Sequence, residues 1–266
     1  MEIITANNIS EFIKIIETHT FVNDDTLFRG QNNSEWFLHP KIARNGFQFR
    51  RNIDSEEKML ETFKRHSNQF ISKDLNNYWD YLVLAQHYGM STRLLDWTKN
   101  PLAALWFCVN RKPNKVEFGS VWILKVEDGY FLKASEIDSE IKRRQPFSKT
   151  DHEALINAYI FDSPFKIENS IVAYQPHLFD NRIINQNGWF TVHGLDDNNH
   201  YLELSTNQSF KNKLVQILIP TSNFSEIRAT LDTLGVNQLT LFPDLVNAAL
   251  YSEWLHTTQD DEPFEE

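Results

Sequence analysis

The stretch from residue 86 to residue 102 reads Gln86-His87-Tyr88-Gly89-Met90-Ser91-Thr92-Arg93-Leu94-Leu95-Asp96-Trp97-Thr98-Lys99-Asn100-Pro101-Leu102. It lies between two segments with apolar helical spacing, where a plain connection would need only a few turn residues. Polar and aromatic side chains crowd it instead, among them the titratable ring of His87, the carboxylate of Asp96 and the flat ring of Trp97. Connections of this kind often carry binding and catalysis. The stretch therefore predicts a functional site between two helices.

The same stretch also has a purely structural interpretation. Arg93 and Asp96 would form an internal ion pair, and Thr98 would cap the helix that begins at Pro101. Both interpretations hold together if Arg93 and Asp96 support a site that their neighbours make. The sequence alone leaves these alternatives open.

Patterns on either side of this stretch predict the remaining elements. The first half favours helices, expected at residues 11–18 after a cap at Asn8 or Ser10, and at 54–72, 75–88 and 101–110, with one strand at 26–30. The second half favours strands, expected at 120–126, 188–193 and 214–219, with helices ending near residues 234 and 255. We therefore expect an α+β fold with a helix-rich first half and a strand-rich second half, in a single domain over residues 1–266 with an acidic tail at 257–266.

Composition limits the classes of protein and of site. The 266 residues are 41% hydrophobic, with 20 Phe and 7 Trp, which is the balance of a globular protein that buries a sizeable core. The net charge of −10 argues against a broad nucleic-acid-binding surface but allows a local basic cleft. No basic and apolar leader and no run of about 20 apolar residues occurs, so we expect no membrane span and a cytoplasmic location.

Spacing of the usual catalytic and metal-binding residues excludes several chemistries. The only cysteine, Cys108, lies in an apolar helical run, so no intrachain disulfide forms and a buried thiol is expected rather than a nucleophile. No His-x-x-x-His spacing, phosphate-binding loop, dinucleotide fingerprint or Gly-x-Ser-x-Gly elbow is present, and no metal is expected.

Two further motifs contain candidate functional residues. Phe28-Arg29-Gly30-Gln31 places an arginine before a glycine at a strand end, which suits a diphosphate or carboxylate in a cleft; alternatively Arg29 pairs with a buried acid. The segment 239–245 has the pattern of a strand that delivers Asp244 to the start of a helix, where an acid is also expected for dipole reasons alone.

These motifs together resemble the FRG-domain family, whose members share an aromatic-Arg-Gly motif, a Gln-His-Tyr-Gly to Pro-Leu block and a Leu-Phe-Pro-Asp motif. Here they are residues 28–30, 86–102 and 241–244, and residues 186–193 resemble a fourth family segment. The resemblance covers about residues 24–255. By analogy with Arg-Ser-Glu-type ADP-ribosyltransferases, it implies a split sheet, NAD as substrate without a metal, and transfer of ADP-ribose to a nucleic acid or a protein.

The analogy also implies roles for individual residues. Asp244 or Asp96 would be the catalytic acid, with Arg29 beside it. The residues expected to bind NAD are Arg29, Gly30, His87, Tyr88, Ser91, Thr92, Arg93 and Trp97. The implied biological role is that of a bacterial toxin or anti-phage effector, for which a cognate antitoxin protein is an expected partner.

Two other functions are compatible with the same residues. One is a binding module for a nucleotide or a nucleic-acid end, in which Trp97, Tyr88 and Arg29 form a platform without chemistry. The other is a nuclease or glycohydrolase that uses His87 or Asp96 as a base.

Overall fold

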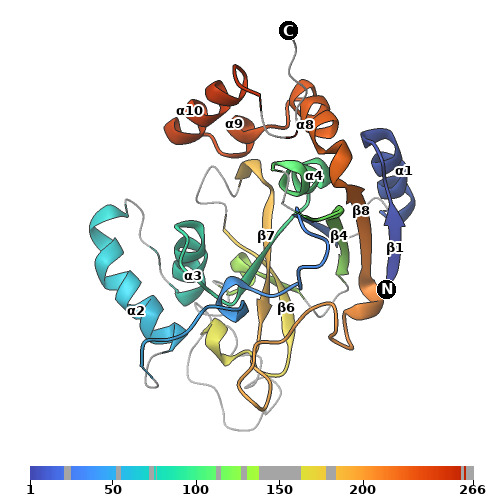
Figure 1. The fold of residues 1–266 in the computed structure, drawn as a ribbon. Helices are drawn as coiled ribbons and strands as arrows, with labels where there is room; N and C mark the ends of the chain where they lie inside the picture. The colour runs from blue at the N-terminus through green and yellow to red at the C-terminus, as the bar shows by residue number, and fades with distance from the viewer. Residues whose placement is uncertain are drawn as a thin grey trace.

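The computed structural model of the chain describes residues 1–20, 25–51, 55–71, 75, 77–111, 115–126, 131–137, 163–177, 184–258 and 261. Strands from both halves of the chain join in one mixed eight-stranded sheet of order β1-β8-β4-β2-β3-β7-β6-β5 (Figure 1). The strands are β1 (Glu2–Thr5), β2 (Asp25–Gln31), β3 (Leu94–Thr98), β4 (Phe118–Val126), β5 (Phe131–Lys133), β6 (Ile171–Gln175), β7 (Gly188–His193) and β8 (Leu214–Pro220). The β1–β8 and β5–β6 pairs are parallel, and the other neighbours are antiparallel.

The sheet is nearly divided in two at its centre. Strand β2 is paired with β4 along its whole length, and β3 is paired with β7 along its whole length. Between β2 and β3, however, the register contains a single pair, Phe28 with Thr98. Two four-stranded halves, β1-β8-β4-β2 and β3-β7-β6-β5, are thus joined by one register pair within a single sheet.

Helices cover the two halves separately. They are α1 (Ile9–His19), α2 (Glu56–Ser67), α3 (Tyr78–His87), α4 (Pro101–Val109), α8 (Phe224–Thr233), α9 (Gln238–Leu241) and α10 (Leu245–Trp254). Short 3₁₀ helices occur at Lys41–Ala43, Asn68–Phe70, Pro164–Lys166, Lys211–Lys213 and Thr221–Asn223. Figure 1 shows α1 beside β1 and β8, α8 and α9 near α4, and α2 and α3 at the opposite side of the molecule.

Three apolar clusters follow this division. The first packs α1, α4 and α8 on the β2-β4-β8 half, with Phe12, Leu105, Val121, Ile217 and Phe224 among its buried members. The second packs α2 and α3 on the β3-β7-β6 half, with Leu60, Trp79, Leu82, Leu94 and Tyr174. The third contains residues of both halves, including Leu27, Leu95, Trp97, Trp122 and Trp189. The third cluster therefore holds the halves together where the strand pairing does not.

Two expected helix starts, after Asn8 and at Pro101, are confirmed because each is set by a local cap. The side chain of Asn8 accepts a hydrogen bond from the third residue after it, and Asn100 caps α4 just before Pro101. Cys108 is fully buried, as expected, and burial raises the pKa of its thiol. The α+β class is also confirmed.

Two predicted elements are wrong. Residues 94–98 form strand β3 rather than a connection between helices, and residues 239–241 belong to helix α9 rather than to a strand. Strands β1, β5 and β6 were not predicted. Strand β1, with β2 and β3, makes the first half less purely helical than expected. None of the helices in the described ranges has the length and apolar character needed to span a bilayer.

Residues 112–114, Asp54, Asp260 and residues 262–266 lie outside the described residues. Asp261 is described, and its carboxylate accepts a hydrogen bond from Arg228 at 2.8 Å. Both side chains are buried, so this acid of the expected tail packs against the fold rather than lying in solvent.

Gly30 sets the distance between β2 and α4. A Cβ atom at this position would lie 1.9 Å from the carbonyl oxygen of Ala104 and 2.6 Å from the backbone nitrogen of Cys108. Both neighbours are backbone atoms of α4, which cannot move without moving the helix. The glycine following Arg29 is therefore required for helix packing.

We predict that Gly30→Ala lowers the free energy of unfolding by about 3 kcal/mol, because the helix must shift to admit a methyl group. Gly46→Ala is the control, since nothing lies within 4 Å of that position and only its φ of +93° adds strain, about 1 kcal/mol. Chemical denaturation of the two variants measures the difference. Equal losses would show that α4 adjusts freely.

Candidate functional site

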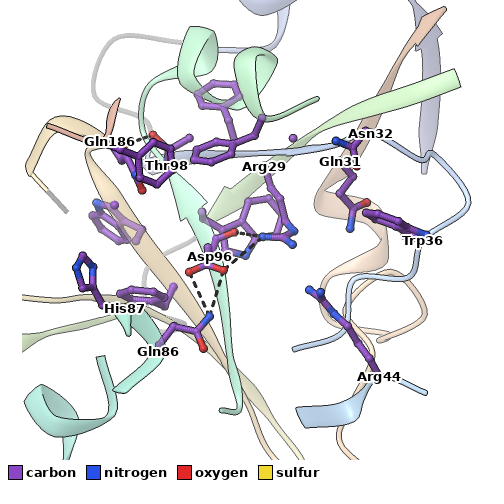
Figure 2. A pocket seen from close by; sticks show the side chains of 18 residues that line it. Arg29, Gln31, Asn32, Trp36, Arg44, Gln86, His87, Asp96, Thr98 and Gln186 are labelled. Atoms are coloured by element: carbon purple, nitrogen blue, oxygen red, sulfur yellow. Dashed lines mark hydrogen bonds and ion pairs between the residues drawn. The ribbon is translucent and has the colours of Figure 1, made fainter. Parts of the chain in front are cut away.

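A cavity of about 350 Å³ lies where β2 and β3 separate. Its walls come from both strands, from β7, from the adjoining ends of α3 and α4, and from segments that follow β2 and α9. Figure 2 shows the side chains of these elements converging on the opening. The volume lies at the lower end of the range for small-molecule sites, so the cavity holds a compact ligand or one part of a larger one.

Arg29 lies at the centre of the separation. Its Nη1 donates a hydrogen bond of 2.7 Å to the backbone carbonyl of Asp96, and the same nitrogen lies 3.9 Å from the Asp96 carboxylate. Burial and the nearby charge of Arg44 lower the pKa of Arg29 to about 10, while Asp96 opposes this shift. The guanidinium, only 13% exposed, therefore remains cationic at neutral pH.

The Nε of Arg29 is buried and has no hydrogen-bond partner among the described residues. An enclosed donor without a partner is costly, and such groups are concentrated where a site trades stability for function. The alternative interpretation, in which Arg29 pairs with a buried acid, fits poorly because Asp96 is 61% exposed.

The carboxylate of Asp96 is held by a chain of hydrogen bonds. Gln86 donates from its Nε2 to both carboxylate oxygens at 3.2 Å, as the dashed lines in Figure 2 show. The Oε1 of Gln86 accepts a hydrogen bond of 2.7 Å from Thr92, which fixes the orientation of the amide. The hydroxyl of Thr92 in turn accepts from the Leu94 backbone at 3.1 Å. The buried Thr92 thus acts through Gln86 to aim Asp96 into the cavity.

The rest of the cavity combines a second cation with aromatic walls. Arg44 and the half-exposed Trp36 lie on one side of Arg29, and His87 lies on the other (Figure 2). The aromatic residues of the wall are Phe28, Trp97, Phe107, Trp189, Phe190 and Phe242. Cations, one carboxylate and flat rings in one cleft suit a ligand with phosphate groups, hydroxyls and an aromatic ring.

A buried hydrogen-bond chain supports one aromatic wall. Trp97 donates from Nε1 to the hydroxyl of Thr191 at 3.0 Å, and that hydroxyl donates to Nε2 of His193 at 2.9 Å. Nδ1 of His193 donates to the Leu202 carbonyl at 2.7 Å, which requires a neutral ring with the proton on Nδ1. Burial lowers the pKa of His193 to about 4, so the chain is intact at neutral pH.

Arg93 has a structural role. Its Nε and its backbone N–H both donate to Glu56, at 2.8 and 2.7 Å, and Nη1 donates to the Pro164 carbonyl. Both charged side chains are almost fully buried. The predicted Arg93–Asp96 bracket is therefore wrong: Arg93 fastens β3 to α2, and Asp96 faces the cavity.

The remaining candidates divide between the cavity and its surroundings. Gly30, His87 and Trp97 line the cavity with Arg29 and Asp96, whereas Ser91 and Tyr88 do not. The ring of Tyr88 is exposed and meets the ring of His87 edge-on at 5.0 Å.

Asp244 is the N-cap of α10, where its side chain accepts a hydrogen bond of 2.8 Å from the Asn247 backbone. It does not line the cavity, although Phe242, two residues earlier, does. The structural interpretation of Asp244 as an acid at a helix start thus matches its position.

Several cavity residues were not among the predicted site residues. They are Phe28, Gln31, Asn32, Trp36, Arg44, Gln86, Thr98, Phe107, Gln186, Gly188, Trp189, Phe190 and Phe242. Gln86, Gln186 and Trp189 lie in the segments that carried the family resemblance, which was the available signal. Within the described residues, no group of three or more His, Cys, Asp or Glu is placed to hold a metal ion.

We predict that Glu56→Ala destabilises the protein by about 3 kcal/mol or more, because Arg93 becomes a buried charge without its partner. Glu57→Ala removes the same charge from the exposed neighbour on α2 and is the control, with a loss below about 1 kcal/mol. Thermal or chemical denaturation compares the two. Similar losses would mean that the Arg93–Glu56 pair is unimportant.

His193 makes stability depend on pH in the acid range. Its folded pKa of about 4 lies below the ordinary value of 6.5, so its contribution is complete above 6.5 and is lost as the pH falls toward 4. Between pH 7.5 and 4.5, we expect the wild type to lose about 2 kcal/mol more than His193→Gln, which does not titrate. Denaturation curves at both pH values test this, and parallel losses would contradict it.

A comparison with known protein families supports part of the family resemblance. Residues 24–117 match the family model described as FRG domain. The matched range contains both the Phe28-Arg29-Gly30 motif and the stretch 86–102, while Asp244 lies beyond it. No curated protein and no solved structure matches the chain significantly. The resemblance is thus confirmed for residues 24–117, which match the FRG domain.

Proposed function

We propose that this protein transfers ADP-ribose from NAD to a macromolecular acceptor. The observation that carries the proposal is the juxtaposition of the largely buried Arg29 and the oriented carboxylate of Asp96 in an aromatic-walled cavity between β2 and β3. NAD would present its phosphates to the guanidinium of Arg29. The positive charge that develops on its ribose as nicotinamide leaves would face the carboxylate of Asp96.

Binding would divide NAD between the cavity and its mouth. The guanidinium groups of Arg29 and Arg44 would contact the diphosphate, for which their planar donor geometry is suited. The nicotinamide ring would lie among the aromatic side chains, where Trp189 and Phe190 border the strand that carries Asp96. Because the cavity is small for a whole dinucleotide, we assign the nicotinamide and its ribose to the interior.

The reaction breaks the bond between the ribose C1′ and the nicotinamide nitrogen, and the electron pair leaves with nicotinamide, which becomes neutral. Positive charge develops on the ribose, and the carboxylate of Asp96 would stabilise it across the cavity. The nucleophilic atom of the acceptor then bonds to C1′ and releases its proton to solvent. Holding both reactants in one cleft supplies the orientation that the step requires.

The geometry favours Asp96 over Asp244 as the acid. Asp96 lines the cavity and is held by Gln86, whereas Asp244 caps α10. An exposed carboxylate in the cavity also favours an enzyme over a module that only binds. Hydrolysis of NAD by the same groups, with water as acceptor, is the second candidate, since the Asp96 side chain is 61% exposed.

The proposed biological role remains that of a bacterial toxin or anti-phage effector acting in the cytoplasm, with an antitoxin as a partner. Support comes from the family resemblance and from the single buried cysteine, which is compatible with a reducing compartment.

We predict that Asp96→Asn lowers the rate of nicotinamide release from NAD at least 100-fold. The substitution keeps the shape of the side chain and removes its charge. Asp244→Asn, in which asparagine remains a good helix cap, should stay within about twofold of the wild type. Arg29→Lys should chiefly raise KM, because a point charge replaces a two-pronged donor.

Two readouts separate the candidate functions. Purified protein is incubated with NAD labelled in the adenylate and with separate pools of cellular protein, RNA and DNA, and nicotinamide is quantified in parallel. Label in one pool identifies a transferase, and nicotinamide release without label identifies a hydrolase. If Asp244→Asn is inactive and Asp96→Asn is not, the acid has been wrongly assigned.

A further inference from the structure

Residues 36–51, the rim segment, border the mouth of the cavity and have an unusual composition. They read Trp36-Phe37-Leu38-His39-Pro40-Lys41-Ile42-Ala43-Arg44-Asn45-Gly46-Phe47-Gln48-Phe49-Arg50-Arg51, with four basic residues, four aromatic residues and no acid. The acid Glu35 precedes the segment. In a chain with a net charge of −10, this is a local concentration of positive charge.

The aromatic side chains of the rim segment are unusually exposed. Phe37 is 67% exposed, Trp36 is 51% exposed and Phe49 is 37% exposed. The rings of Phe47 and Phe49 meet edge to face at 5.1 Å. Exposed rings beside arginines are the features that proteins use to stack bases of single-stranded nucleic acid.

The rim segment connects the cavity to a second depression. Trp36 and Arg44, near its start and middle, line the cavity between β2 and β3. Residues 47–51, at its end, line an open groove of about 810 Å³ against α2. The side chains that α2 adds to the groove include Lys58 and Arg65 as well as Glu57 and Glu61. The cations exceed the acids along this groove, unlike in the chain as a whole.

We propose that the rim segment and its groove bind single-stranded nucleic acid and lead it toward the cavity. The arginines would contact phosphates, and Phe37, Phe49 and Trp36 would stack on bases. A duplex hides the faces of its bases from such rings, and an acidic protein would use the cations but not the rings. That this strand is the acceptor of ADP-ribose rests on the proposed function; the binding itself does not.

The test measures the affinity of a fluorescent 12-nucleotide single strand, as RNA and as DNA, by anisotropy at several salt concentrations. We expect Phe49→Ser to weaken binding about tenfold, because one stacked base is lost. Arg50→Ser should weaken it and make the dependence of log Kd on log salt shallower by about 0.7. Phe70→Ser and Lys14→Ser are matched controls, since both side chains are exposed outside the groove and should leave affinity unchanged.

Competitors and a parallel activity assay decide between outcomes. Weak competition by polyglutamate and by the matched duplex supports the proposal, whereas equal competition by polyglutamate overturns it in favour of an acidic protein partner. No binding at 50 mM salt, or no effect of Phe49→Ser, also overturns it. Nicotinamide release is measured on the same samples: its absence with intact strand binding refutes only the proposed function, and its presence without strand binding refutes only this inference.

Discussion

The hydrogen bond from Arg29 to the carbonyl of Asp96 lies at the point where two halves of a sheet part. Strands β2 and β3 share one register pair, so the backbone groups beyond it lack the partner strand that a continuous ladder would provide. The guanidinium of Arg29 donates to the Asp96 carbonyl in place of a backbone N–H of a neighbouring strand. Because the arginine side chain is long, it makes this bond although the two strands have separated. The separation of β2 from β3 therefore leaves this carbonyl hydrogen-bonded, and the cavity lies at the centre of the sheet rather than at its edge.

The same constraint explains how the stretch 86–102 combines two tasks. Consecutive side chains of a strand point to opposite faces, so neighbours in sequence serve different surroundings. In β3, Leu95 joins the core cluster that both halves share, Asp96 faces the opening, and Trp97 contributes to both the cluster and the cavity wall. Arg93, one residue before the strand, turns instead to Glu56. Residues that stabilise the fold and residues that line the cavity thus alternate within one short segment.

This interleaving also limits what the sequence can predict. Helix starts at Asn8 and Asn100 were predictable because a cap is made by residues a few positions apart. Strand β3 was not, because its partner β7 is remote in sequence and its apolar run is short. Likewise, Arg93 pairs with Glu56, which is 37 residues away, rather than with Asp96, three positions later.

A similar local ambiguity affected residues 239–242. Their alternation of apolar and polar side chains is typical of a strand, yet Asn237 and Thr240 form a reciprocal cap that begins α9. Arg29, His87, Asp96 and Trp97, which the family resemblance singled out without assigning elements, line the cavity.

The charges of Arg29 and Asp96 pair only loosely, with 3.9 Å between the guanidinium nitrogen and the carboxylate oxygen. A two-pronged pair between Arg29 and Asp96 would be the strongest contact available to both. Instead the guanidinium donates to a backbone carbonyl, the carboxylate stands 3.9 Å away, and the uncharged amide of Gln86 occupies both carboxylate oxygens. Neither charge is therefore fully paired by the other. A ligand with negative phosphates and a ribose that becomes positive would complete the arrangement, since the guanidinium would meet the phosphates on binding and the carboxylate would meet the positive charge as the ligand reacts.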